Sequence, residues 1–274
     1  MTEQIAFVGG GNMATSLIGG LLARGMSPAQ IVVADPEPSQ RARLEHDHGV
    51  RTAADAATAA AAAQTIVLAV KPQHMAEVAR SIAGLVASRR PLVISVAAGI
   101  RLQDLARWLG PGVPLVRCMP NRPALIGAGI TALYAAPEVP AASRAAADRI
   151  LAACGPTVWV PEESQLDVVT AVSGSGPAYV FLLIECLESA GIELGLDPAT
   201  ARRLAVETAH GAGRMAAESP DSPAELRAQV TSKGGTTAAA LQVLDTAGVR
   251  AIFAAAVAAG ARRSSELAAE FGTL

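Results

Sequence analysis

Short apolar runs alternate with longer mixed stretches through the first half of the chain, up to about Cys154. The runs are rich in Val, Ile and Leu and show little polar alternation, which is typical of strands buried on both faces of a parallel sheet. These predicted strands lie at Ile5–Val8, Ile31–Ala34, Thr65–Val70, Leu92–Val96, Leu115–Arg117 and Ile130–Tyr134. The stretches between them predict helices at Asn12–Ala23, Gln40–Asp47, Met75–Ala87 and Leu102–Trp108, with a short alanine-rich helix in Ala53–Ala63. Strands that alternate with helices predict an α/β domain with a Rossmann-type doubly wound sheet over residues 1–160.

The pattern changes after Val158–Val160, and no further convincing strand follows. Asp197-Pro198 and Ser222-Pro223 each match an N-cap residue followed by proline at the first helical position. Helices are predicted at Glu162–Ala171, Gly176–Leu194, Pro198–Glu218, Ala224–Val230, Thr236–Thr246 and Val249–Phe271. The second half therefore predicts an all-helical domain over residues 164–274.

Composition narrows the function classes. Apolar residues make up 51% of the chain and the net charge is −2, so the basic patch of a nucleic-acid binder is not expected. The three cysteines lie far apart, which predicts reduced thiols and neither a disulfide framework nor a metal site. The N-terminus lacks the features of a signal peptide, and the longest uncharged stretch, Val168–Ile184, is interrupted by glycine and proline. These features predict a soluble cytoplasmic protein without a membrane span.

A glycine-rich turn follows the first predicted strand. Gly9-x-Gly11-x-x-Ala14 lies between a strand and a helix, and Asp35 ends the next strand about 20 residues on, as the dinucleotide fingerprint requires. The pyrophosphate is expected over Gly9 to Ala14 at the helix N-terminus, flanked by Asn12 and Met13. The alternative is an ordinary glycine turn of an α/β sheet.

The choice between NADPH and NADH depends on Asp35. A carboxylate there would bond the ribose hydroxyls of NAD and repel the 2′-phosphate of NADP. Alternatively, Asp35-Pro36 simply starts a loop, and Arg41 or Arg43 could offset the repulsion. Both cofactors stay open, with NADPH as the expected one and NADH as a second that the chain can use.

Other predicted strands end in small residues on the same edge of the sheet, where ligands of open parallel sheets bind. Lys71 could act as a general acid, as a cation beside the cofactor or as a plain surface lysine, and we favour the supporting role. The expected cofactor contacts at these strand ends are Ala69, Val70, Lys71, Pro72, Ala97, Ala98, Gly99 and Asn121.

A second glycine-rich turn opens a predicted helix near the C-terminus. Glycines let the backbone approach a ligand, and free N–H groups at a helix N-terminus attract an anion. This turn therefore predicts a site for a small carboxylate, although Thr236 also suits a plain N-cap. Its residues are Ser232, Gly234, Gly235, Thr236 and Thr237.

Taken together, these motifs closely resemble the pyrroline-5-carboxylate reductase family, over essentially the whole chain. The matching segments are GGGNMA at 9–14, AVKPQ at 69–73, SVAAGI at 95–100, RCMPN at 117–121, AVSGSGPAY at 171–179 and VTSKGGTTAAALQVLD at 230–245. The last two are specific to this family among related dehydrogenases, whereas the first is widely shared.

The resemblance implies reduction of the cyclic imine 1-pyrroline-5-carboxylate to L-proline with NADPH or NADH, the last step of proline biosynthesis. It places Ser173, Ser175 and Gly176 with the second glycine turn in the substrate pocket, and it implies an obligate dimer, in some members assembled into a decamer. The hydroxyl of Thr237 both donates and accepts hydrogen bonds, so it can serve the imine and the product amine as the catalytic contact.

Three positions depart from the family pattern: Arg122 replaces a usual Thr, Gln229 a common Asn, and Asp35 a residue that accepts phosphate in several relatives.

Two alternative functions remain beside the reductase. They are a β-hydroxyacid dehydrogenase of the 6-phosphogluconate dehydrogenase superfamily and a non-catalytic dinucleotide sensor. Against the former, Lys233, the only lysine after residue 160, sits in a glycine turn and not on a helix.

The chain has four histidines, His46, His48, His74 and His210. Their spacing does not suit a metal site, and we expect all four to be non-catalytic. We expect His210 to be buried in the core of the helical domain.

Overall fold

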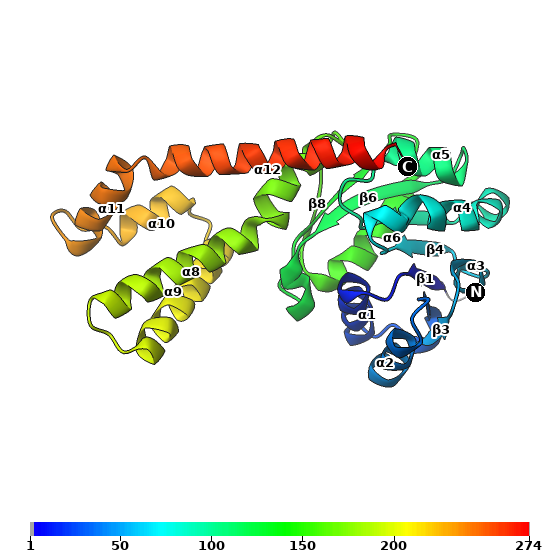
Figure 1. Cartoon of the computed structure of the whole chain (residues 1–274), viewed down its shortest axis with the longest axis horizontal. Helices are drawn as coiled ribbons and strands as arrows, with labels where there is room; N and C mark the ends of the chain where they lie inside the picture. The colour runs from blue at the N-terminus through cyan, green and yellow to red at the C-terminus, as the bar shows by residue number, and fades with distance from the viewer. Residues whose placement is uncertain (1–2, 274) are drawn as a thin grey trace. The chain divides into compact units, whose positions relative to one another are not determined.

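The computed structural model describes residues 3–273. It contains two compact units, Met1–Gly174 together with Ala259–Leu274, and Ser175–Ala258. The first unit holds a sheet with helices on both of its faces, and the second is helical (Figure 1). The predicted α/β fold followed by helices is therefore confirmed.

The sheet has eight strands in the order β3-β2-β1-β4-β5-β6-β7-β8. Six of them run parallel, and β7 and β8 run in the opposite direction because β7 pairs antiparallel with β6. The chain leaves β1 for β2 on one side and reaches β4 on the other, so the strand order reverses at β1. Open α/β sheets bind ligands at such a reversal. The strands are β1 Ile5–Val8, β2 Ile31–Ala34, β3 Arg51–Ala53, β4 Thr65–Leu68, β5 Leu92–Ser95, β6 Leu115–Pro120, β7 Thr131–Ala135 and β8 Thr157–Trp159.

Two clusters of buried side chains pack against the two faces of the sheet. One contains Leu17 of α1 and Ile150 of α6, and the other contains Ile82 of α4 and Leu105 of α5. The helices of this unit are α1 Asn12–Ala23, α2 Pro38–His48, α3 Ala56–Ala60, α4 Pro72–Arg89, α5 Leu102–Leu109, α6 Ala141–Leu151 and α7 Gln165–Val169. Short turns of helix lie at Pro28–Gln30, Arg122–Ile126 and Ala152–Cys154, and a π-helical turn follows α7 at Thr170–Gly174.

The second unit begins with an antiparallel pair of helices, α8 and α9, side by side in Figure 1. Asp197 caps α9 by accepting hydrogen bonds from the Ala199 and Thr200 N–H groups, and the Thr200 side chain, together with these backbone bonds, lowers the pKa of its carboxyl. A Cβ on Gly191 of α8 would lie 3.3 Å from the Ala201 methyl, so the glycine allows close packing. The helices are α8 Gly176–Glu193, α9 Pro198–Glu218, α10 Pro223–Gln229, α11 Thr236–Thr246 and α12 Val249–Phe271, whose last part belongs to the first unit.

Several element bounds differ from the predictions for local reasons. Ala53 ends a strand, β3, that we did not predict, and the alanine-rich helix shrinks to α3 because Asp55 caps it. Helix α2 starts at Pro38, earlier than predicted, since proline suits the first turn. Packing divides the chain at Gly174 and not near residue 160. The functional roles assigned to residues 1–160 and 164–274 stay predictions.

Candidate active site

The first glycine turn has the geometry of a phosphate cradle. Gly9 has a φ of +97°, and a Cβ there would lie 2.7 Å from the carbonyl oxygen of Ala69, so only glycine fits. A Cβ on Gly10 would lie 2.7 Å from Leu44 Cδ1. Gly11, the N-cap of α1, has nothing within 4 Å of its Cβ position. The turn is thus tight on its protein side and open at the helix N-terminus, where an anion fits.

Asp35 lies beside this turn at the end of β2. Its Oδ2 accepts a hydrogen bond from the Gly10 N–H at 2.9 Å, and its Oδ1 accepts one from the Glu37 N–H at 3.0 Å. Arg41 donates to the carbonyl oxygens of Asp35 and Pro36, at 2.8 and 2.9 Å. Backbone groups therefore fix the Asp35 carboxylate at the expected ribose position, and they engage the guanidinium of Arg41.

A cavity of about 620 Å³ opens at this corner of the sheet. Its lining includes Asp35, Asp55 and Glu77 as well as Lys71 and His74, and hydrogen bonds from Thr58 lower the pKa of Asp55. Asp55 and Glu77 were not predicted as site residues. Of the predicted cofactor contacts, the lining includes Gly9, Gly11, Asp35, Ala69, Val70 and Lys71.

The other predicted cofactor residues lie outside the lining of this cavity. Asn12, Met13 and Ala14 form the first turn of α1, and Pro72 starts α4. Ala97, Ala98 and Gly99 follow β5, and Asn121 follows β6. Because β1, β2, β4, β5 and β6 are parallel, all of these residues lie at or next to one edge of the sheet, as predicted.

Asn121 connects the end of β6 to the turn that contains Ser173 and Gly174. Its Nδ2 donates to the Ser173 carbonyl oxygen at 3.3 Å, and its Oδ1 accepts from the Ile130 N–H at 3.0 Å. A Cβ on Gly174 would lie 2.8 Å from Met119 Cε, which shows how closely the turn packs. Ser173 lies in the π-helical turn, a type of local structure that is frequent at functional sites.

The second glycine turn lies in the helical unit. Gly234 has a φ of +71°, and Gly235 caps α11 with its N–H bonded to the Ser232 carbonyl oxygen at 3.1 Å. Thr236 and Thr237 form the first turn of α11, with Thr236 exposed and Thr237 half-buried. Ser175 and Gly176 start α8 in the same unit. The structure thus places the expected cofactor residues in one unit and most of the expected substrate residues in the other.

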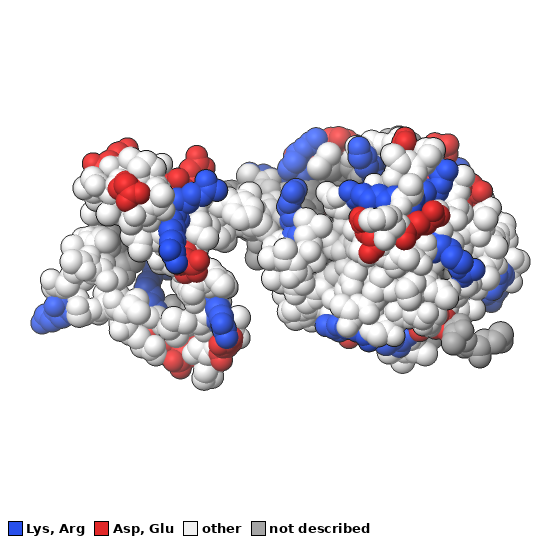
Figure 2. Space-filling view, turned by 90° about the horizontal axis from the view of Figure 1, so that it is seen from below, with Lys and Arg blue, Asp and Glu red and all other residues white. Residues whose placement is uncertain are grey.

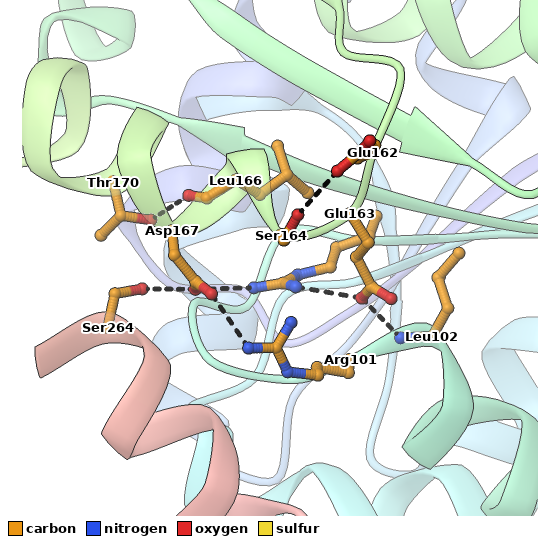
Figure 3. Close-up of polar contacts among 10 residues, drawn as sticks. Arg101, Leu102, Glu162, Glu163, Ser164, Leu166, Asp167, Thr170 and Ser264 are labelled. Atoms are coloured by element: carbon orange, nitrogen blue, oxygen red, sulfur yellow. Dashed lines mark hydrogen bonds and ion pairs between the residues drawn. The ribbon is translucent and has the colours of Figure 1, made fainter. Parts of the chain in front are cut away.

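Figure 3 shows a set of charged and polar side chains that we did not predict as functional residues. Arg117 of β6 binds Glu163 at 3.0 Å, and Arg101 binds Asp167 of α7 at 2.9 Å. The hydroxyl of Ser264 on α12 donates to Asp167 Oδ1 at 2.8 Å. We call Arg101, Arg117, Glu163, Asp167 and Ser264 the charge cluster. Arginine within an otherwise apolar strand was the one sequence signal for it.

The histidine prediction was wrong in one respect. His210 is 73% exposed in this chain, and its nearest charged neighbour is Glu207 at 3.8 Å. The buried residues of α9, the helix that carries His210, are Ala201 and Ala205. Over residues 3–273, no group of three or more His, Cys, Asp or Glu side chains could hold a metal ion.

The chain is similar to known proteins along its whole length. Residues 163–267 match the family model for pyrroline-5-carboxylate reductase dimerisation, and residues 4–99 match the model for NADP oxidoreductase, coenzyme F420-dependent. A pyrroline-5-carboxylate reductase of Pseudomonas aeruginosa is 46% identical over 271 residues, which cover 99% of both chains.

Solved structures agree with these matches. A pyrroline-5-carboxylate reductase from Coxiella burnetii has a TM-score of 0.94 at 39% identity, covering 97% of this chain and 99% of that one. The Plasmodium falciparum pyrroline carboxylate reductase with NADP bound has a TM-score of 0.85 at 26% identity, covering 97% and 98%. The identity, the coverage and the two glycine turns lead to one conclusion: the chain belongs to the pyrroline-5-carboxylate reductase family.

Proposed function

We propose that this chain reduces the C=N bond of 1-pyrroline-5-carboxylate to give L-proline, with NADPH or NADH as the reductant. The observation that carries the proposal is the near-complete match to reductases of this name, together with a phosphate cradle at the sheet reversal. When bound, the reduced nicotinamide supplies the hydride. The test is turnover of the imine with each reduced cofactor. Absence of turnover with both, together with oxidation of a β-hydroxyacid, would favour the 6-phosphogluconate dehydrogenase alternative.

The residues of the first unit fit a dinucleotide. In this proposal the open N-terminus of α1 at Gly11 holds the pyrophosphate, and Asp35 binds the ribose of the adenosine half. The small side chains of Ala97 and Ala98 leave room beside the strand ends for the nicotinamide half, and Asn121 lies at the next strand. Lys71, the N-cap residue of α4, lies in the cavity lining and acts as a supporting cation.

The residues of the second unit fit the substrate. The free N–H groups at the start of α11, with Ser232 as a helper, take the carboxylate of the imine. The Thr237 hydroxyl donates to or accepts from the ring nitrogen, which suits both the imine and the amine. Ser175 and Gly176, at the start of α8 in the same unit, are also proposed substrate residues, as is Ser173 in the π-helical turn of the first unit. Holding the imine in one orientation accounts for most of the rate, because a protonated imine accepts hydride readily.

Removal of the Thr237 hydroxyl tests the substrate role. Thr237→Ala should keep cofactor affinity and lower kcat/KM for the imine by roughly 10- to 100-fold, the equivalent of about 1.5–3 kcal/mol for a hydrogen bond to a charged group. Thr246→Ala removes a hydroxyl from the other end of the same helix, where it binds the Gln242 carbonyl oxygen at 2.7 Å, and serves as the control. An unchanged kcat/KM in Thr237→Ala would remove Thr237 from the mechanism.

The cofactor preference depends on the fixed carboxylate at the end of β2. Asp35→Ser removes a charge that would face a 2′-phosphate, so the ratio of kcat/KM for NADPH over NADH should rise by about tenfold. Asp47→Ser removes an exposed carboxylate from α2, where His46 lowers its pKa, and should leave the ratio unchanged. If the ratio does not move in Asp35→Ser, Asp35 is a turn residue only.

The assembly and location belong to this proposal as well. The dimerisation match supports a homo-oligomer in which residues 164–274 pair, as a dimer or as a decamer built from dimers. By length and composition the helical segment Gln165–Glu193 could cross a membrane. The same residues match the dimerisation model, which favours burial of their apolar side chains against a partner chain. Acidic and basic side chains are interspersed on the face in Figure 2, in keeping with a cytoplasmic enzyme that binds no nucleic acid.

A further inference from the structure

The loop after β5 is fixed at both of its ends. Its first residue, Val96, donates its N–H to the Leu68 carbonyl oxygen at 3.1 Å. At its far end the Arg101 guanidinium binds Asp167 Oδ2 at 2.9 Å, and the Leu102 N–H donates to Glu163 Oε1 at 2.8 Å. The loop between these anchors carries Ala97, Ala98 and Gly99, which the proposed function places beside the nicotinamide half of the cofactor.

The last turns of α12 hold the same loop from another side. A Cβ on Gly99, whose φ is +76°, would lie 2.9 Å from the ring of Phe271. The Ser264 hydroxyl, two turns earlier on α12, donates to Asp167. Arg107 of α5 donates to the Gly272 carbonyl oxygen at 2.6 Å. The C-terminal helix therefore packs directly against this loop and is bonded to the residue that anchors it.

The same carboxylates also hold the segment that carries Ser173. Glu163 lies in the turn before α7 and Asp167 lies within α7, and the π-helical turn that carries Ser173 follows α7 directly. Arg117, whose side chain is only 3% exposed, binds Glu163 at 3.0 Å and lies 3.9 Å from Asp167. Directly after β6, Asn121 donates a hydrogen bond to the Ser173 carbonyl oxygen. Two arginines and two carboxylates thus connect the end of the Ala97–Gly99 loop with the segment that carries Ser173.

We infer that the charge cluster is a positioning device for the reduction: it fixes the Ala97–Gly99 loop relative to the Ser173 turn, with α12 as its third support. The inference rests on the proposed function. Apolar packing alone could stabilise this region at lower cost, because buried ion pairs contribute little net stability. What the ion pairs add is a defined geometry, since each guanidinium and each carboxylate has directed hydrogen bonds.

Arg101 is the best residue for the test. Its side chain is 23% exposed, and after its replacement the buried carboxylate of Asp167 still has Arg117 at 3.9 Å, while Glu163 keeps its ion pair with Arg117. Arg101→Gln should weaken binding of NADPH and NADH by roughly tenfold, as expected when one charge-assisted hydrogen bond is lost. It should also lower kcat at saturating substrate and cofactor by about tenfold, because small misplacements of reacting groups are costly. Arg101→Lys keeps the charge and should restore part of both losses.

Two further variants make the outcome decisive. Ser264→Ala removes a single hydrogen bond to Asp167 and should weaken cofactor binding in the same direction by roughly threefold. Arg263→Gln changes the neighbouring residue on α12, whose ion pairs with Glu266 and Glu270 stay on that helix, and should change neither quantity.

Cofactor affinity is measured by fluorescence titration without substrate, kcat by imine turnover, and Tm on the same samples. The inference is overturned if Arg101→Gln and Ser264→Ala lower Tm but leave cofactor affinity and kcat within about twofold of wild type. The charge cluster would then have a purely structural role. If the wild-type chain binds the cofactor but does not reduce the imine, the proposed function fails, whereas the affinity comparison still tests the cluster.

Discussion

The two compact units differ in where their apolar side chains lie. In Met1–Gly174 with Ala259–Leu274, two clusters of buried side chains cover both faces of the sheet. In Ser175–Ala258, neither α8 nor α11 has a buried residue, and the buried side chains of residues 175–258 are those of Ala201 and Ala205. Many large apolar residues there are half exposed or more, among them Phe181, Leu183, Leu204, Met215, Val243, Ile252 and Phe253.

This difference shows which unit is complete within one chain. Exposed apolar patches of this extent mark an interaction surface on a soluble protein. The match of residues 163–267 to a dimerisation model identifies the kind of surface. We therefore expect the first unit to be stable by its own packing and the second to gain its core from a partner, so that its stability depends on protein concentration.

The largest effect should come from a charge placed on α8. Phe181 is 62% exposed in the single chain, and Phe181→Asp would bury an unpaired carboxylate in the interface. We expect a loss of roughly 3–5 kcal/mol in association, enough to give monomers at micromolar concentration, together with a loss of turnover. Sedimentation velocity measures the assembly.

Ala62→Asp is the control for this variant. It adds the same charge to an exposed position of the first unit and should leave the assembly intact. If Phe181→Asp sediments like wild type, Phe181 does not lie in the interface, and the contrast between the units loses its main support.

A pair of Ile→Ala changes compares the two kinds of core. Ile94 of β5 is fully buried in the first unit, and Ile94→Ala should lower the free energy of unfolding by about 2–5 kcal/mol at any protein concentration. Ile252 of α12 is 61% exposed in the single chain, so Ile252→Ala should matter only where a partner covers it. Thermal unfolding over a hundredfold dilution series separates the two, since only the Ile252→Ala deficit in Tm should change with concentration. Equal, concentration-independent deficits would contradict the comparison.

The sequence predicted the sheet well because each buried strand is a short Val- and Ile-rich run whose signal is local. It also predicted that the residues expected to bind the cofactor lie along one edge of the sheet, since parallel strands end on the same side. Strand β3 was missed because Arg51–Ala53 is three residues long and lacks an apolar run. The direction of β7 depends on pairing with β6, which no local pattern encodes.

Neither the charge cluster nor the exposure of His210 could be predicted from the sequence, for two physical reasons. Arg101 and Asp167 are 66 residues apart, and Asp167 and Ser264 are 97 apart, so only the fold brings them together. Helical periodicity reveals an apolar face but not what covers it. It therefore cannot distinguish a core within the chain from a surface for a partner, and His210 was assigned to the wrong one.

The smallest effect separates the units by the reactivity of their thiols. Cys118 and Cys154 are buried in the first unit, and burial raises the pKa of both thiols, so below these raised pKa values they stay protonated and unreactive. Cys186 of α8 is exposed in the single chain. If a partner covers α8, Cys186 should react slowly with a maleimide in concentrated protein and faster on dilution or in Phe181→Asp, with Cys118 and Cys154 unlabelled until the protein unfolds. Mass spectrometry of timed samples gives the labelled site. Fast labelling of Cys186 in the intact assembly would show that this part of α8 faces solvent, and the partner would then have to cover the unit through α9, α11 or the first turns of α12.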